Sequence, residues 1–229
     1  GSIWYLYSKN AIKNIYNFNS NSKIIIMIRN PADMIYLLHN QKLNSKDEDV
    51  DDFEGAFKLS WQREKGYNVP QKCKEKTTLY YHKVANYYKQ LKNVYKFFPK
   101  NQVKVILYDD FAKSNLKIYK EVLKFLNIKY NKRLSFIKIN ESSIERSRKI
   151  GTLIKRPPKF ISNVAKFAKK FGFKVYDIQK LLIRLNTSYA ERKSLDNKMR
   201  ILINNHYKES TYKLSKILKN KHIKKWLEV

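Results

Sequence analysis

The chain has 229 residues, of which 43% are hydrophobic and 14% aromatic, enough to bury one sizeable core. Its formal net charge of +30 makes partners that carry phosphate or sulfate the first class to consider. The single cysteine, Cys73, excludes an internal disulfide framework, and no apolar run approaches the roughly 18 residues of a membrane span, so we expect a cytoplasmic protein with no transmembrane segment in this chain.

The first part of the chain alternates between helical and strand patterns. Residues 9–18 carry apolar side chains at helical spacing, and residues 23–28 form a short, almost continuous apolar run. Such a run is typical of a strand that is buried on both faces in a parallel sheet. It ends at Arg29-Asn30-Pro31, and Pro31 suits the first turn of a helix that we expect to reach about His39.

The pattern continues with two helices and a second strand. An amphipathic helix is predicted to end near Trp61, after an acidic stretch over residues 47–54. A long helix is predicted over residues 77–98, and a strand over residues 102–108. Asn127 then suits the C-terminal side of a helix that begins after Ser114.

The remaining residues predict a loop with a short helix (residues 137–173), a final helix (residues 194–218), and Trp226 packed onto the body. Neither a repeat nor a flexible linker divides the chain, so we expect one domain over residues 1–229. Strands that alternate with helices predict an α/β fold in which helices cover a central parallel sheet.

Several stretches, in the same order along the chain, resemble sulfotransferases that use 3′-phosphoadenosine 5′-phosphosulfate (PAPS), closest to the bacterial and heparan-type branch. They are Trp4–Ser8, residues 23–33 with Arg29-Asn30-Pro31, residues 98–111, residues 122–128, and the terminal helix with Trp226. The resemblance implies a P-loop-like, three-layer α/β fold with the donor at the C-terminal ends of the parallel strands, which is the general rule for open α/β sheets.

The resemblance also implies donor-binding residues. Arg29 corresponds to the arginine that binds the 3′-phosphate of the donor, and a guanidinium at the start of a helix can make two parallel bonds to a phosphate. The alternative is that Arg29 only caps the sheet edge or pairs with Asp33. Arg146 and Lys149 match, in position and charge, the basic loop that closes over the adenosine and its 3′-phosphate; the alternative is a plain solvated loop.

One position departs from the family pattern. Leu37 stands where the family usually has a serine whose hydroxyl binds the same phosphate. A leucine cannot donate, so either Tyr36 or His39 replaces the hydroxyl or donor binding is weaker by about 1.5–3 kcal/mol.

The family's catalytic groups are not assigned to residues of this chain. The resemblance places the phosphate loop with its lysine, the first strand and the glutamate base before Gly1, so that the chain corresponds to the C-terminal three-quarters of the domain and is expected to be inactive alone. His39 and His82 are alternative proton-transfer groups, although packing is the simpler interpretation. Asp109 and Asp110 are expected to be structural.

The resemblance predicts transfer of a sulfuryl group from PAPS to the hydroxyl or amine of an acceptor, with a glycan among the candidates. No metal is expected, because the four histidines and Cys73 lack ligand spacing. A non-catalytic relative is the first alternative, favoured by Leu37. The second is a basic nucleic-acid-binding protein, but the positive charge is mostly lysine and spread along the chain, so no specific nucleic-acid partner is expected.

Overall fold

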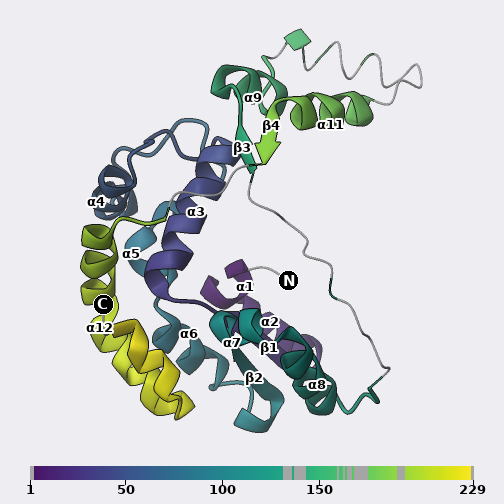
Figure 1. Cartoon of the computed structure of the whole chain (residues 1–229), viewed down its shortest axis with the longest axis vertical. Helices are drawn as coiled ribbons and strands as arrows, with labels where there is room; N and C mark the ends of the chain where they lie inside the picture. Colours follow the sequence, from purple (N-terminus) through teal and green to yellow (C-terminus); the bar gives the residue numbers. More distant parts are fainter. Residues whose placement is uncertain are drawn as a thin grey trace. The chain divides into compact units, whose positions relative to one another are not determined.

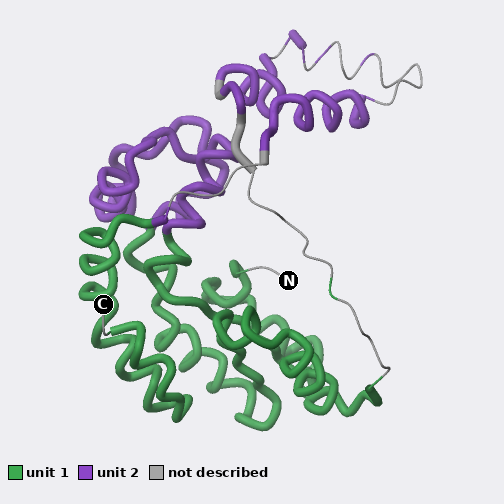
Figure 2. Tube along the Cα trace, viewed as in Figure 1, with its two compact units in different colours: residues 1–35, 81–137, 195–229 green, residues 36–80, 138–194 purple. Residues whose placement is uncertain are grey.

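The computed structural model describes residues 3–130, 136, 143–158, 160, 161, 163, 167, 175–189 and 194–227. Packing divides the chain into two compact units, shown in Figure 2. The first unit comprises residues 1–35, 81–137 and 195–229, and the second comprises residues 36–80 and 138–194. The chain therefore passes between the units four times. The single domain over residues 1–229 stays a prediction.

The first unit contains a parallel pair of strands. Strand β1 (Ile24–Ile28) lies beside β2 (Val103–Leu107), with Ile24 opposite Val103 and Ile28 opposite Leu107. This pair, among helices, confirms the predicted α/β class (Figure 1). The helices of this unit are α1 (Ile3–Tyr7), α2 (Ala11–Phe18), α5 (Tyr81–Val84), α6 (Tyr87–Val94), α7 (Tyr108–Lys113), α8 (Asn115–Leu126), α12 (Asn197–Leu218), and the 3-10 helices η2 (Lys100–Gln102) and η3 (Lys221–Leu227).

Strand β1 is buried on one face only. Ile26 and Ile28 are buried, whereas Ile25 and Met27 remain 42% and 46% exposed. The prediction of burial on both faces is therefore wrong for this strand. The physical reason is that the described residues provide packing partners for only one of the two faces to which successive side chains of a strand point.

The prediction of one long helix over residues 77–98 is wrong, because the structure has three short helices there with two interruptions between them. The pieces are η1 (Lys76–Leu79), which belongs to the second unit, α5 and α6. Asn86 lies at the second break, where its side chain accepts a hydrogen bond from the backbone N–H of Lys89 (3.2 Å) and so caps α6. Asparagine competes in this way with continuation of a helix, which apolar spacing alone does not reveal.

Other local predictions agree with the structure. Helix α8 ends at Asn127 in the left-handed conformation (φ 62°). Trp226 is buried, and its indole N–H donates to the carboxylate of Asp109 at 3.1 Å. Asp110 lies 3.1 Å from the Nδ1 atom of His222. Both aspartates therefore join α7 to η3, which confirms their structural role.

The second unit is built around a buried ion pair. Its elements are most of α3 (Pro31–Ser45), α4 (Phe53–Glu64), α9 (Arg148–Lys155), α11 (Val175–Leu185) and an antiparallel pair, β3 (Ser143–Glu145) and β4 (Thr187–Tyr189). Arg63 of α4 donates two hydrogen bonds, of 2.6 and 2.7 Å, to the carboxylate of Glu48. Both side chains are fully buried. Sequence patterns predicted neither the β3–β4 pair nor α11.

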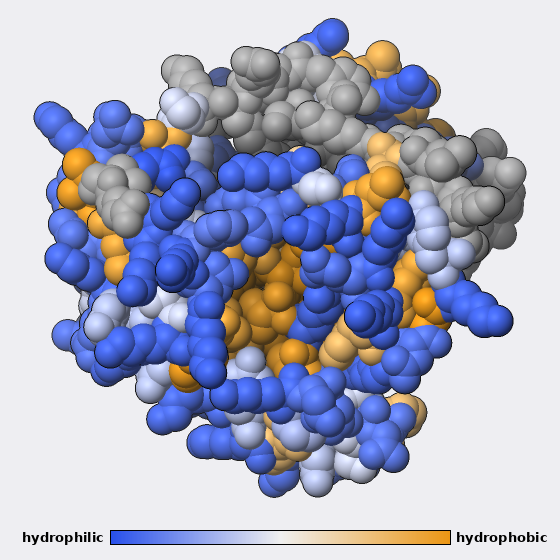
Figure 3. All heavy atoms as spheres, turned by 60° about the horizontal axis from the view of Figure 1, so that its bottom comes forward, coloured by the Kyte–Doolittle hydropathy of each residue, from blue (hydrophilic) through white to orange (hydrophobic). Residues whose placement is uncertain are grey.

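On the face shown in Figure 3, the described surface is mostly hydrophilic, with hydrophobic areas between the charged side chains. Among the described residues, no helix is both long and apolar enough to cross a membrane.

Candidate anion-binding site

The site is formed where β1 ends and α3 begins. Ile28 is the last residue of the strand, and Pro31 is the first of the helix. The side-chain oxygen of the buried Asn30 accepts a hydrogen bond from the backbone N–H of Ala32 at 2.9 Å, which caps the helix. Arg29 is therefore fixed beside a helix N-terminus, where backbone N–H groups and the helix dipole favour an anion.

The Arg29 side chain is oriented by an aromatic ring. Its guanidinium lies over the ring of Tyr108, 4.4 Å from the ring centre. Its Nε atom is buried and has no hydrogen-bond partner among the described residues. The side chain as a whole is 33% exposed, so its outer nitrogens can meet a ligand. A held guanidinium with an unmet donor suits a phosphate or sulfate oxygen.

The alternative that Arg29 simply pairs with Asp33 fits the geometry poorly. The Nε atom of Arg29 lies 3.8 Å from the nearer Asp33 oxygen, beyond hydrogen-bond distance. The other Asp33 oxygen accepts a hydrogen bond of 2.7 Å from Arg200 of α12. Asp33 is therefore bonded mainly to Arg200.

Tyr87 of α6 fixes the backbone at the same junction. Its hydroxyl hydrogen-bonds to the backbone of Arg29. Burial raises the pKa of Tyr87, so the phenol is neutral at physiological pH and adds no charge to the site. The junction is thus held by hydrogen bonding at the backbone and by stacking at the side chain.

Arg146 and Lys149 lie in the second unit, at the start of α9. Ser147 caps this helix by accepting a bond from the backbone N–H of Ile150 (3.4 Å). The backbone of Arg146 and Ser147 is tied to Asn186, with bonds of 2.8 Å to its carbonyl and 3.0 Å to its amide oxygen. Arg146 and Lys149 are both exposed. Two cations at a helix N-terminus oppose the helix dipole and leave this place open to an anion. Of residues 137–173, which were predicted as a loop with a short helix, residues 137–142, 159, 162, 164–166 and 168–173 lie outside the described residues.

Leu37 is half-buried in the part of α3 that belongs to the second unit. The neighbours predicted as replacements for the missing hydroxyl, Tyr36 and His39, are used in packing. The ring of Tyr36 lies 5.2 Å from that of Phe53, and the Nε2 atom of His39 lies 2.8 Å from the Val50 carbonyl. Burial lowers the pKa of His39, so its ring is neutral at physiological pH.

Sequence patterns missed three residues that build the site: Tyr87, Tyr108 and Arg200. The helical spacing of Arg200 with Ile203 and Tyr207 places a cation on the buried face of α12, a signal that sequence inspection could have found. Among the described residues, no group of three histidine, cysteine, aspartate or glutamate side chains could hold a metal ion.

Comparison with known proteins places this chain in a family. Residues 11–193 match the sulfotransferase domain. The structure is similar to the crystal structure of a sulfotransferase from Alicyclobacillus acidocaldarius, with a TM-score of 0.62 and 16% sequence identity. The match covers 98% of this chain but 65% of that protein, so the chain spans about two thirds of its length, and at this identity the likeness concerns the fold alone. No curated protein matches the chain.

Proposed function

Because the chain belongs to the sulfotransferase domain family, we propose that the natural protein transfers a sulfuryl group from PAPS to a hydroxyl or amine of an acceptor. The observation that carries the proposal is the position of the Arg29 side chain and its lack of a close partner for Nε among the described residues. Its guanidinium is fixed at a strand-to-helix junction, stacked on Tyr108, with a buried Nε atom that lacks a hydrogen-bond partner among the described residues. The side chain is 33% exposed, so a phosphate oxygen could accept hydrogen bonds from its outer nitrogens.

The donor would be held through its phosphates. We assign the 3′-phosphate to Arg29 and the helix N-terminus beside it. Arg146 and Lys149 are our candidates for further contacts, because both are exposed at the start of α9. Leu37 offers no hydrogen bond at the position where the family has a serine. We therefore propose that affinity for the donor depends more strongly on Arg29 here than in relatives that keep the serine.

The reaction would be an in-line displacement at sulfur. A base takes the acceptor proton, the acceptor oxygen or nitrogen bonds to sulfur, and the bond between sulfur and the nucleotide phosphate breaks. The leaving group is 3′-phosphoadenosine 5′-phosphate (PAP), whose developing charge needs fixed donors. We assign neither the base nor the donor at the leaving oxygen to a residue of this chain.

A carbohydrate is the acceptor to test first. The second unit contains an open hollow of ≈ 820 Å³, whose lining includes Asp49, Asn68 and Gln71. Carboxylates accept hydrogen bonds from hydroxyls, and side-chain amides both accept and donate them; a sugar presents many hydroxyls. Leu37 favours a second candidate, a relative that binds PAP without catalysing transfer.

Calorimetry with PAP tests the donor site in the full natural protein. Arg29→Ala should weaken binding by about 1.5–3 kcal/mol, the value of a hydrogen bond to a charged group. Arg184→Ala is the matched control, because Arg184 is exposed on α11 and should leave PAP affinity unchanged. Equal affinity of wild type and Arg29→Ala would remove Arg29 from the site.

An assay with labelled PAPS and a panel of sugars then separates the two candidate functions. Binding of PAP without transfer of the label supports the non-catalytic candidate.

A further inference from the structure

The carboxylate of Asp33 lies between two arginines and bonds them unequally. One oxygen accepts a hydrogen bond of 2.7 Å from Nη2 of Arg200, whereas the other lies 3.8 Å from Nε of Arg29. The Asp33 and Arg200 side chains are 26% and 22% exposed, so water screens their attraction only in part. A carboxylate this close to Arg29 lowers the electrostatic attraction that the guanidinium presents to an anionic ligand, and more so the closer it lies.

Arg200 is held in place by the core of the first unit. It lies near the start of α12, whose residues Met199, Ile203 and Tyr207 are buried. The Tyr207 hydroxyl donates to the carbonyl of Tyr81 at 2.7 Å and accepts from the backbone N–H of Ala85 at 3.4 Å. The helix that carries Arg200 is thus anchored by packing and by hydrogen bonds, and Arg200 presents a fixed partner to Asp33.

Arg29 keeps its orientation without a close bond to Asp33. Stacking on Tyr108 at 4.4 Å holds the guanidinium, and its buried Nε atom has no hydrogen-bond partner among the described residues. Asp33 follows Arg29 by four residues, so a small rotation of its side chain would bring the carboxylate onto this donor. A carboxylate in that place would neutralise the guanidinium and compete with a phosphate.

We propose that Arg200 is a positioning residue: by holding the carboxylate of Asp33, it keeps Arg29 available for the 3′-phosphate of the donor. Arg200 does not need to touch the donor for this effect. The inference rests on the proposed function, because it concerns the ligand of Arg29. The effect of Arg200 on binding must then pass through Asp33 and disappear when Asp33 carries no charge.

A double-mutant cycle measured by calorimetry with PAP tests this dependence in the full natural protein. Arg200→Gln should weaken PAP binding roughly ten-fold, as expected for coupled groups in one ion-pair network. Arg200→Lys, which can still hold the carboxylate, should recover most of that loss. The combination of Arg200→Gln with Asp33→Asn should restore binding to near the wild-type value, because the competing charge is gone.

The outcomes separate the inference from the function on which it rests. A purely structural role for Arg200 predicts that the double variant binds PAP no better than Arg200→Gln and melts at a lower temperature. That result, or unchanged binding by a folded Arg200→Gln, would overturn the inference while PAP still binds through Arg29. If Arg200→Gln does not fold, Arg200→Met with and without Asp33→Asn provides the same comparison, because methionine keeps the apolar stem but cannot hold the carboxylate. A wild-type protein that does not bind PAP would overturn the proposed function and the inference together.

Discussion

Replacing Arg63 should destabilise the protein strongly, because its partner Glu48 would be left charged and buried. The two side chains are fully buried and share hydrogen bonds of 2.6 and 2.7 Å. Arg63 also donates from Nε to the carbonyl of Asn68 at 3.1 Å, so a second, part-buried hydrogen bond is lost. Breaking such a pair costs about 3–5 kcal/mol. Glu48 keeps bonds from the backbone N–H groups of Asp49 and Val50 (both 3.0 Å), which favours the lower end of that range.

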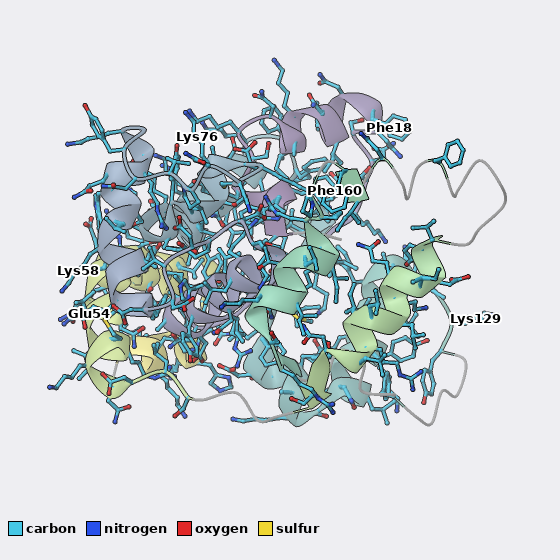
Figure 4. The ribbon with its side chains drawn as sticks, turned by 90° about the horizontal axis from the view of Figure 1, so that it is seen from above. Phe18, Glu54, Lys58, Lys76, Lys129 and Phe160 are labelled. Carbon is cyan, nitrogen blue, oxygen red and sulfur yellow. The ribbon has the colours of Figure 1, made fainter. Side chains whose placement is uncertain are left out.

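Urea unfolding of Arg63→Met measures the change in the free energy of unfolding, provided that the dependence on urea stays the same. Lys58→Met is the matched control on the same helix, since Lys58 pairs with Glu54 on the outer side of α4 (Figure 4). This exposed pair should contribute little to stability. The double variant Glu48→Gln with Arg63→Met should regain part of the loss, because no unpaired charge remains. A loss below about 1 kcal/mol for Arg63→Met would match an exposed pair and refute the reasoning.

Three further changes test the donor site and the stability of the protein. Leu37→Ser should tighten PAP binding by about 1.5 kcal/mol or more in calorimetry, because it restores a hydroxyl donor; a lower melting temperature without a gain in affinity would show that Leu37 serves packing. Burial lowers the pKa of His39, so the unfolded chain binds a proton at this residue more readily than the folded protein does. The stability contributed by neutral His39 should therefore be complete above the ordinary pKa of 6.5 and should decline as the pH falls below it. Urea midpoints measured downward from neutral pH should fall less for His39→Gln, and parallel curves would contradict this. The amide nitrogen and oxygen of Asn204 are buried without a hydrogen-bond partner among the described residues, so Asn204→Leu should raise the free energy of unfolding by about 1–3 kcal/mol; a decrease would show that the amide makes a needed contact.

Local patterns predicted the elements that carry Arg29. The apolar run over residues 23–28 and the following Pro31 predict a strand and a helix with a short junction, and the structure has both. The left-handed Asn127 and the buried Trp226 were predictable for the same reason, since each depends on a preference of the residue itself. The break at Asn86 was missed because apolar spacing continues across it, and only the side-chain cap interrupts the helix.

Long-range pairings are the part of the site that the sequence could not predict. Asp33 and Arg200 are 167 residues apart, and helical spacing places Arg200 on a buried face without identifying its partner. Likewise, the family pattern identifies Arg29 but does not say whether the neighbouring Asp33 neutralises it. The answer depends on which arginine binds the Asp33 carboxylate, which lies 2.7 Å from Arg200 and 3.8 Å from Arg29. A sequence that keeps Arg29-Asn30-Pro31 but lacks a cation at the position of Arg200 would therefore look equally able to bind the donor, yet its arginine would be paired with Asp33.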